Sequence, residues 1–282
     1  MREKPFYSIR TGKNAGGTRL TFQQLNRLFI SLYKSLQFEG YFQEYFGYIC
    51  VDEGPISGKL GDDIEGEIIL QVRKSNLWPV GDRIQDYAED DLFDVIEFLY
   101  EYVSKPVERQ YHSWNECGWH CHTFDREAGR GEFREKVNRI LREYSDGFEL
   151  SGDGEVLSLP QSGLEPLLEE PFPAHDPLNV DPQVQAAIRK FRRHHASPND
   201  KRDAIRDLAD VLEFLRPKLK AILTSKDEND LFTILNNFGL RHHNVSQRIA
   251  YHKAIWYDWL FYFYLAAIHG AIRLMTEGNR QS

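Results

Sequence analysis

The sequence predicts a mainly α-helical protein, in which an α+β N-terminal domain with small β elements precedes a C-terminal four-helix bundle. Apolar residues recur at helical spacing in several long segments, whereas strand-like runs are short and stop before residue 160. Prolines gather in the segment that follows. Because 282 residues exceed the usual size of one core, we expect domains at 1–160 and 181–282, joined by a proline-rich linker at 161–180.

Three amphipathic helices are expected in the N-terminal domain. The first begins after Thr21, whose hydroxyl can cap it, and ends at Gly40. The second spans Glu89–Val103, where the apolar side chains fall on one stripe. The third runs from Gly131 to Tyr144 with similar spacing. Each therefore has one apolar face, as a helix packed on a core requires.

Short β-compatible runs accompany these helices. Tyr45–Val51 and Glu67–Val72 fit short strands or helix ends equally well, because runs of this length do not distinguish the two. Phe148–Leu150 and Glu155–Leu157 flank a turn that contains two glycines, and glycine allows the positive φ of tight hairpin turns. We expect these two runs to pair as a hairpin that closes the domain.

Four helices are expected in the C-terminal domain. The first opens at Asp181–Pro182, a capping residue followed by a proline suited to the first turn. The second starts at Ser197–Pro198, and Pro217 within it predicts a kink or a break near Glu213. Ser225 can cap the third. The fourth is the long apolar segment at the C-terminal end.

Charge is divided unevenly along the chain. Residues 1–180 contain 19 lysines and arginines against 32 acidic residues, whereas residues 181–282 contain 16 against 11. A basic C-terminal domain beside an acidic N-terminal one is compatible with an anionic partner such as RNA. Uneven surface charge without any nucleic-acid ligand is the alternative, since dedicated nucleic-acid binders are more strongly basic.

Cysteine usage and the N-terminal sequence indicate the compartment. Cys50, Cys117 and Cys121 form no even disulfide framework. The first residues, Met1–Tyr7, lack the apolar core of a secretion signal. We therefore predict a cytoplasmic protein.

The apolar segment Ile255–Met275 is about long enough to span a membrane. It contains Asp258, His269 and Arg273, and each of these is costly within lipid. A buried bundle helix or a dimer interface is therefore expected, with no membrane span. A buried Asp258 requires a partner, either an arginine of the preceding segment or a tyrosine hydroxyl across the bundle.

A cluster of basic and polar residues lies immediately before this last helix. Histidine exchanges protons near neutral pH, and arginine stays charged and binds phosphate oxygens. RNA cleavage without a metal needs a base for the 2′-hydroxyl, an acid for the leaving oxygen and a cation for the phosphate. We therefore predict a catalytic site that needs no cofactor or metal, formed by Arg241, His242, His243, Asn244 and His252.

Three arginines are candidates for binding the substrate. Arg248 lies four residues before His252, so the two share a face of a helix. Arg192 and Arg193 form a further basic patch that would follow a phosphate backbone. Two alternatives remain: the patch is a solvated helix end, and the Arg241–Asn244 turn only caps the helices on either side.

The order of these helices, with Asn236–Asn244 before a long aromatic helix, resembles the HEPN superfamily. The likeness is to HEPN domains in prokaryotic abortive-infection proteins of the AbiJ-like type, and it covers about residues 181–277. It implies a helical domain that forms a homodimer through its C-terminal helices. It further implies a metal-independent endoribonuclease of phage defence or of a toxin system. The N-terminal domain would then sense a signal, restrain the nuclease or recruit another molecule, and a regulatory partner protein is one possibility.

The HEPN signature is an arginine, often with a polar residue after it, followed by four to six residues and a histidine. Arg241 and His242 match its start, whereas Ser246, Gln247 and Arg248 occupy the places where the histidine is expected. HEPN domains that lack catalytic activity and act only by binding are common in the superfamily. The alternative implied by the resemblance is thus a non-catalytic module that binds RNA or protein, or mediates dimerisation.

A second segment, Tyr111–His122, combines thiols with imidazoles. Such side chains can hold zinc, although structural zinc sites favour paired ligands at regular separations. Packed aromatic residues with partly satisfied histidines are the other interpretation. The zinc alternative would use Cys117, His120, Cys121 and His122.

Overall fold

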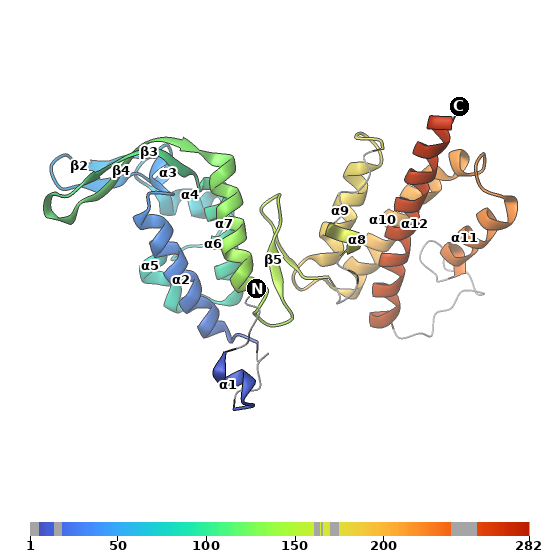
Figure 1. The fold of residues 1–282 in the computed structure, drawn as a ribbon, viewed down its shortest axis with the longest axis horizontal. Coiled ribbons are helices and arrows are strands. Elements are labelled where there is room, and N and C mark those ends of the chain that lie inside the picture. Colours follow the sequence, from blue (N-terminus) through green and yellow to red (C-terminus); the bar gives the residue numbers. More distant parts are fainter. Residues whose placement is uncertain are drawn as a thin grey trace. The chain divides into compact units, whose positions relative to one another are not determined.

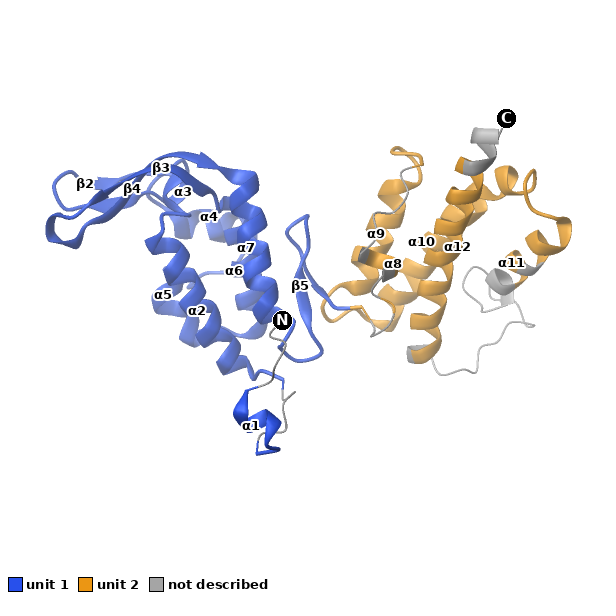
Figure 2. Cartoon of the chain, in the orientation of Figure 1, with its two compact units in different colours: residues 1–159 blue, residues 160–282 orange. Residues whose placement is uncertain are grey.

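The structure is a computed structural model that describes residues 6–13, 19–160, 164, 166–169, 175–237 and 253–281. The chain is mainly helical, in agreement with the prediction of a mainly α-helical protein. It divides into two compact units, residues 1–159 and 160–282 (Figure 2). Each unit has its own hydrophobic core and is described by itself.

Helices supply most of unit 1 (Figure 1). Thr21 begins α2 with a capping box, in which its hydroxyl accepts from the Gln24 amide at 3.3 Å and Gln24 Oε1 accepts from the Thr21 amide at 2.8 Å. The predicted start of this helix is therefore confirmed. The helices of the unit are α1 (Tyr7–Arg10), α2 (Phe22–Phe38), α3 (Gln43–Phe46), α4 (Ile64–Val72), α5 (Val80–Arg83), α6 (Glu89–Tyr102) and α7 (Arg126–Leu141), with 3₁₀ turns at Ile84–Asp86 and Trp114–Glu116.

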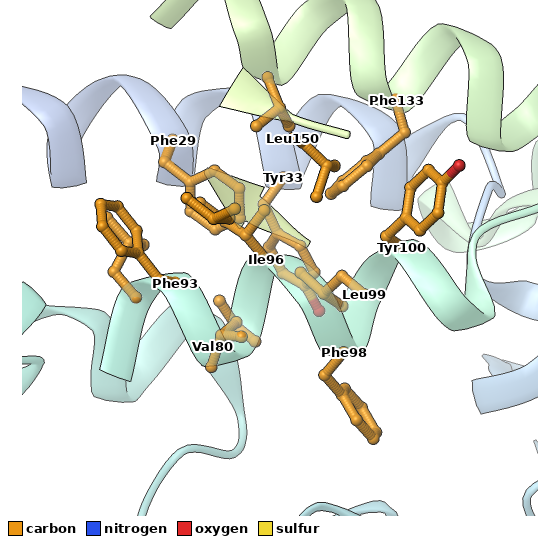
Figure 3. Packing of buried hydrophobic residues seen from close by; sticks show 14 of the residues in the cluster. Phe29, Tyr33, Val80, Phe93, Ile96, Phe98, Leu99, Tyr100, Phe133 and Leu150 are labelled. Carbon is orange, nitrogen blue, oxygen red and sulfur yellow. The ribbon is translucent and has the colours of Figure 1, made fainter. Parts of the chain in front are cut away.

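The core of unit 1 lies between α2, α6 and α7. Figure 3 shows Phe29 from α2, Ile96 and Leu99 from α6, and Phe133 from α7 converging on one another. All four are almost completely buried. Removing this much apolar surface from water is the main stabilising contribution to the unit.

Two helices begin at aspartate caps that were not predicted; one of them decides between the strand and helix alternatives for Glu67–Val72, and the other starts earlier than expected. Glu67–Val72 belongs to α4, whose start is fixed by Asp63 Oδ1 accepting from the Gly66 amide at 2.8 Å. The helix predicted from Gly131 begins at Arg126, where Asp125 Oδ1 accepts from the Ala128 amide at 2.9 Å. In both places the N-cap determines the boundary, and apolar spacing alone does not reveal it.

The strands described in the chain form three antiparallel pairs. One pair confirms the predicted hairpin after residue 147. The 105–125 hairpin, in contrast, was not predicted. The pairs are β1 (Tyr48–Cys50) with β2 (Gly54–Ile56), β3 (Lys105–His112) with β4 (Gly118–Asp125), and β5 (Phe148–Leu150) with β6 (Val156–Ser158).

The described part of unit 2 is helical, with α10 packed against both α9 and α12. Leu164, Leu167 and Leu168 of the predicted linker pack against its core, so this segment belongs to the unit. No helix among the described residues is long and apolar enough to cross a membrane. The helices are α8 (Pro166–Glu169), α9 (Asp181–Arg192), α10 (Pro198–Leu219), α11 (Ser225–Asn237) and α12 (Lys253–Gln281).

Two expected features of unit 2 need correction. Pro217 lies in the last turn of α10, and the helix is not broken at Glu213. Only one helical hydrogen bond is lost there, because proline lacks the amide that would donate to residue 213. Thr224, rather than Ser225, caps α11, since its hydroxyl accepts from the Asp227 amide at 3.2 Å.

A carboxyl group on α6 predicts a pH effect on the stability of unit 1. Burial raises the pKa of Glu97, and the charges of Asp94 and Glu155 raise it further, although Glu97 Oε1 accepts from the Val156 amide at 2.7 Å. The folded state therefore holds this proton more tightly than the unfolded state, so its ionisation reduces stability as pH rises above the ordinary value. Glu97→Gln keeps the accepting oxygen and is expected to raise the urea midpoint at pH 7.

The gain from Glu97→Gln is expected to disappear near pH 4, where the wild-type carboxyl is protonated. Urea unfolding at the two pH values measures it. Glu135→Gln, on the exposed face of α7, is the control and is expected to change the midpoint little. The same gain at both pH values would contradict the assignment.

Candidate functional site

The predicted catalytic residues Arg241, His242, His243, Asn244 and His252 lie outside the described residues, as does Arg248. The helices on either side are described. α11 ends at Asn237 and α12 begins at Lys253. The predicted site therefore belongs to the segment of chain that connects these two helices.

The predicted phosphate-binding pair at the end of α9 differs in exposure. Arg193 is exposed at the C-cap, whereas Arg192 is buried. The nearby Lys190 forms an ion pair with Asp207 of α10. Only Arg193 of the pair therefore presents substantial surface to a phosphate.

Asp258, five residues into α12, pairs with a residue that the sequence reasoning did not consider. Its Oδ1 lies 2.9 Å from Nζ of Lys201 on α10. The same ammonium group lies over the ring of Phe191, 4.9 Å from the ring centroid. This ion pair therefore links the first turns of α12 to α10.

In unit 1, the structure gathers two thiols and two imidazoles from different hairpins. Cys50, His112, Cys117 and His120 each offer one ligand atom, and these four atoms lie within 4.8 Å of one another. Sγ of Cys50 is 3.9 Å from Nδ1 of His112, and Sγ of Cys117 is 3.2 Å from Nε2 of His120. We call these four residues the Cys2His2 cluster.

The register of the β3–β4 hairpin brings two members of the cluster to one face. His120 on β4 lies directly opposite Gln110 on β3, and His112 is two residues beyond Gln110 on β3. Residues directly opposite, and residues two apart on a strand, share a face. The opposite face carries Tyr111 against Trp119, with ring centroids 5.0 Å apart. The imidazoles therefore lie together, away from these aromatic rings.

The turn between β3 and β4 places the third member. Asn115, Glu116 and Gly118 all have positive φ, at 47°, 56° and 102°. This backbone conformation is uncommon for residues other than glycine. It places Cys117 with its Sγ near His120, while the thiol also lies 3.8 Å from the carbonyl oxygen of Ile49 in the other hairpin.

Cys50 ends β1 and is buried. The amide of Asp52 donates to its sulfur at 3.4 Å, and Oδ2 of Asp52 lies 3.2 Å from Nε2 of His112. The ring of Tyr48 packs against that of His120 at 4.7 Å between centroids. The short β1–β2 hairpin therefore contacts several members of the cluster.

Two of the four ligands predicted for zinc lie outside the cluster. Cys121 is on the opposite face of β4, where its amide donates to Gln43 Oε1 at 3.0 Å and burial raises the pKa of its thiol. His122 is exposed at a bulge, since Arg109 is opposite Cys121 and Glu108 is opposite Thr123. The cluster therefore shares Cys117 and His120 with the predicted set, and Cys50 and His112 are its other two members.

Cys50 and His112 escaped the sequence reasoning for different reasons. Cys50 lies 62 residues before His112, and no spacing rule links a cysteine to a cluster so far along the chain. His112 belongs to the segment already singled out, with four residues between it and Cys117 and two between Cys117 and His120. A hairpin turn between these residues, had it been recognised in the sequence, would have identified His112 as a member of the cluster.

No protein-family model, no curated protein and no solved structure matches the chain.

Proposed function

We propose that the C-terminal unit is an HEPN-like domain that acts as a metal-independent endoribonuclease, of the kind found in abortive infection or toxin systems. The position of the arginine- and histidine-rich segment carries the proposal. It connects α11 to α12, and α12 is a long helix rich in aromatic residues. HEPN domains have their signature at the corresponding place, near the start of the last long helix.

The chemistry assigned to this segment follows from its residue types. Arg241 and Arg248 supply fixed positive charge for the phosphate, and the histidines supply a base and an acid. Proton transfer by positioned groups of this kind contributes roughly 10²–10⁴-fold to a rate. Asn244 is assigned to hold the substrate by hydrogen bonding.

A homodimer through the C-terminal helices is part of the proposal. Ile255, Trp259 and Leu274 of α12 are large apolar residues with substantial exposure in the single chain. Ala266 and Gly270, on the same helix, are also exposed, and these five positions follow one another at intervals of four or seven residues. Pairing of two such stripes about a twofold axis would remove this surface from water.

The N-terminal unit is assigned a regulatory role. Its acidic balance repels RNA, whereas residues 181–282 carry an excess of basic residues. A partner protein or a signal recognised by the N-terminal unit would then control the nuclease. In this proposal, RNA binds to the C-terminal unit alone.

RNA cleavage in the presence of EDTA tests the nuclease proposal. The wild-type chain is expected to cleave total RNA with and without the chelator, and to arrest growth when expressed. The double variant Arg241→Ala, His242→Ala is expected to slow cleavage by roughly 100-fold or more. Arg206→Ala is the control, because Arg206 lies on the exposed surface of α10, 3.8 Å from Asp203. Undiminished cleavage by the double variant would refute the proposal.

A non-catalytic HEPN-like module is the second candidate. It is favoured by Ser246, Gln247 and Arg248, which stand where the signature histidine is expected. In this case the wild-type chain would bind RNA without cleaving it. Binding would weaken as salt is raised, and Arg193→Ala with Arg248→Ala would reduce it further. Electrophoretic mobility shifts alongside the cleavage assay distinguish the two candidates.

A further inference from the structure

We propose that Cys50, His112, Cys117 and His120 bind one structural Zn²⁺ ion, which joins the β1–β2 hairpin to the turn of β3–β4. The primary observation is the approach of four ligand atoms from two separate hairpins to within 4.8 Å of one another. Figure 1 shows β2 lying near the far end of the β3–β4 ribbon. The inference is independent of any activity of the C-terminal unit.

The spacing of the ligand atoms fits a tetrahedral zinc ion. Zinc bonds of about 2.3 Å to sulfur and 2.0–2.1 Å to nitrogen place neighbouring ligand atoms about 3.3–3.8 Å apart. Two of the separations, 3.9 Å for Cys50 with His112 and 3.2 Å for Cys117 with His120, lie close to this range. Small side-chain movements are therefore enough to form the complete site.

The ligand types identify the metal. Two thiolates and two imidazoles in a tetrahedral arrangement are typical of zinc, whereas magnesium and calcium require oxygen ligands. On binding, the two thiols release two protons and the imidazoles bind as neutral ligands, so the centre carries no net charge. Four protein ligands leave no position for water or substrate. The centre is therefore structural and not catalytic.

Asp52 supplies the outer interactions that zinc sites commonly have. With Nδ1 of His112 directed to the cluster, Nε2 lies 3.2 Å from Oδ2 of the Asp52 carboxylate. This contact favours the tautomer whose Nδ1 lone pair is free for the metal. The Asp52 amide also donates to Sγ of Cys50 at 3.4 Å and stabilises the thiolate. One residue therefore orients two ligands.

The hairpins that carry the ligands need such a link, because they lie outside the main core. None of the residues 48–56 or 105–125 belongs to the apolar core of unit 1 or packs directly against it as a partly buried apolar residue. Ile49 and Trp114 near the cluster are largely exposed. Isolated two-stranded hairpins are marginally stable in water. Zinc would join two of them and stabilise the turn with its positive φ values.

A disulfide between Cys50 and Cys117 is the competing use of these thiols. It would leave unexplained why an imidazole nitrogen faces each of the two sulfur atoms, His112 at Cys50 and His120 at Cys117. It would also leave the contact between Asp52 and His112 without a role. Zinc accounts for all of these contacts together, and the disulfide becomes an outcome of the test.

Metal analysis of the full-length chain, purified from zinc-containing medium without a histidine tag, tests the proposal. We expect about one zinc per chain. Cys50→Ser and His112→Gln are expected to reduce this below about one tenth under the same conditions. Cys121→Ser and His122→Gln are the matched controls, from β4, the strand that carries the ligand His120, and are expected to keep the metal. Asp52→Asn is expected to weaken zinc affinity about 10-fold.

Cobalt substitution of the wild-type chain keeps the test decisive if a ligand variant fails to fold. Co²⁺ is expected to give the intense visible bands of tetrahedral geometry together with thiolate charge-transfer absorption, and zinc is expected to displace it. Chelation is expected to increase tryptic cleavage after Arg109 at least about tenfold. Absence of zinc with no cobalt spectrum, loss of zinc in the Cys121 and His122 controls, or a Cys50–Cys117 disulfide in non-reducing mass spectra would each overturn the proposal.

Discussion

Gly129→Ala is expected to destabilise the N-terminal unit by roughly 3 kcal/mol or more. A Cβ at this position of α7 would lie 2.4 Å from the Lys105 nitrogen and 2.6 Å from the Ser104 Cα. These are backbone atoms at the start of β3, so no flexible side chain can move aside. The helix would have to shift away from the root of the β3–β4 hairpin.

Gly131→Ala is the matched control, two residues further along α7. Nothing lies within 4 Å of a Cβ at Gly131, which is exposed. Alanine is favoured over glycine in a helix interior by about 1 kcal/mol, so this variant is expected to be more stable than the wild type. Urea unfolding monitored by tryptophan fluorescence gives the change in unfolding free energy for both variants. Equal effects of the two substitutions would contradict a close approach of α7 to β3.

Arg216→Met is expected to destabilise the C-terminal unit by about 3 kcal/mol. Nε of Arg216 lies 2.5 Å from Oε1 of Glu228, a carboxylate at the start of α11 that is almost completely buried. The guanidinium also lies 4.1 Å from the centroid of the Phe232 ring and 3.4 Å from a carboxylate oxygen of Glu213. Methionine retains much of the apolar volume but leaves the buried carboxylate poorly compensated.

Arg206→Met provides the comparison, because Arg206 is on the same helix and its ion pair among the described residues is with the exposed Asp203, at 3.8 Å. Exposed pairs of this kind contribute roughly 0–1 kcal/mol. Thermal unfolding should therefore separate the two variants by several degrees. The double variant Arg216→Met, Glu228→Gln is expected to recover part of the loss, since it removes a buried carboxylate charge that would otherwise face the more distant Lys220, at 4.0 Å. No recovery would indicate that packing on Phe232 dominates.

Local signals in the sequence predicted much of the helical structure. Ser197 and Asp200 form a capping box at the start of α10, as the serine followed by proline indicated. Thr21 acts similarly in α2. These signals are reliable because both partners of each hydrogen bond lie within one turn of chain. Asp63 and Asp125 act in the same way, and the apolar pattern that follows them is too weak to mark the helix start.

The cluster on the two hairpins could be predicted only in part, because it depends on contacts between distant segments. Cys117 and His120 were identified from their own segment. Cys50 reaches them only through tertiary packing of β1–β2 on the turn of β3–β4. Strand alternation also excluded Cys121, although it is adjacent to His120. Proximity along a strand therefore misleads where every second side chain points away.

The register of β3 with β4 contains two irregularities, one extra residue at Val107 and another at His122. Each alone would turn every later side chain of its strand to the other face. Because one falls on each strand, their effects offset, and the far end of the ribbon keeps matched faces. The hairpin could therefore gain or lose one residue on each strand together without changing which side chains share a face. A single deletion in β3 would instead rotate His112 toward the face now occupied by Tyr111 and Trp119.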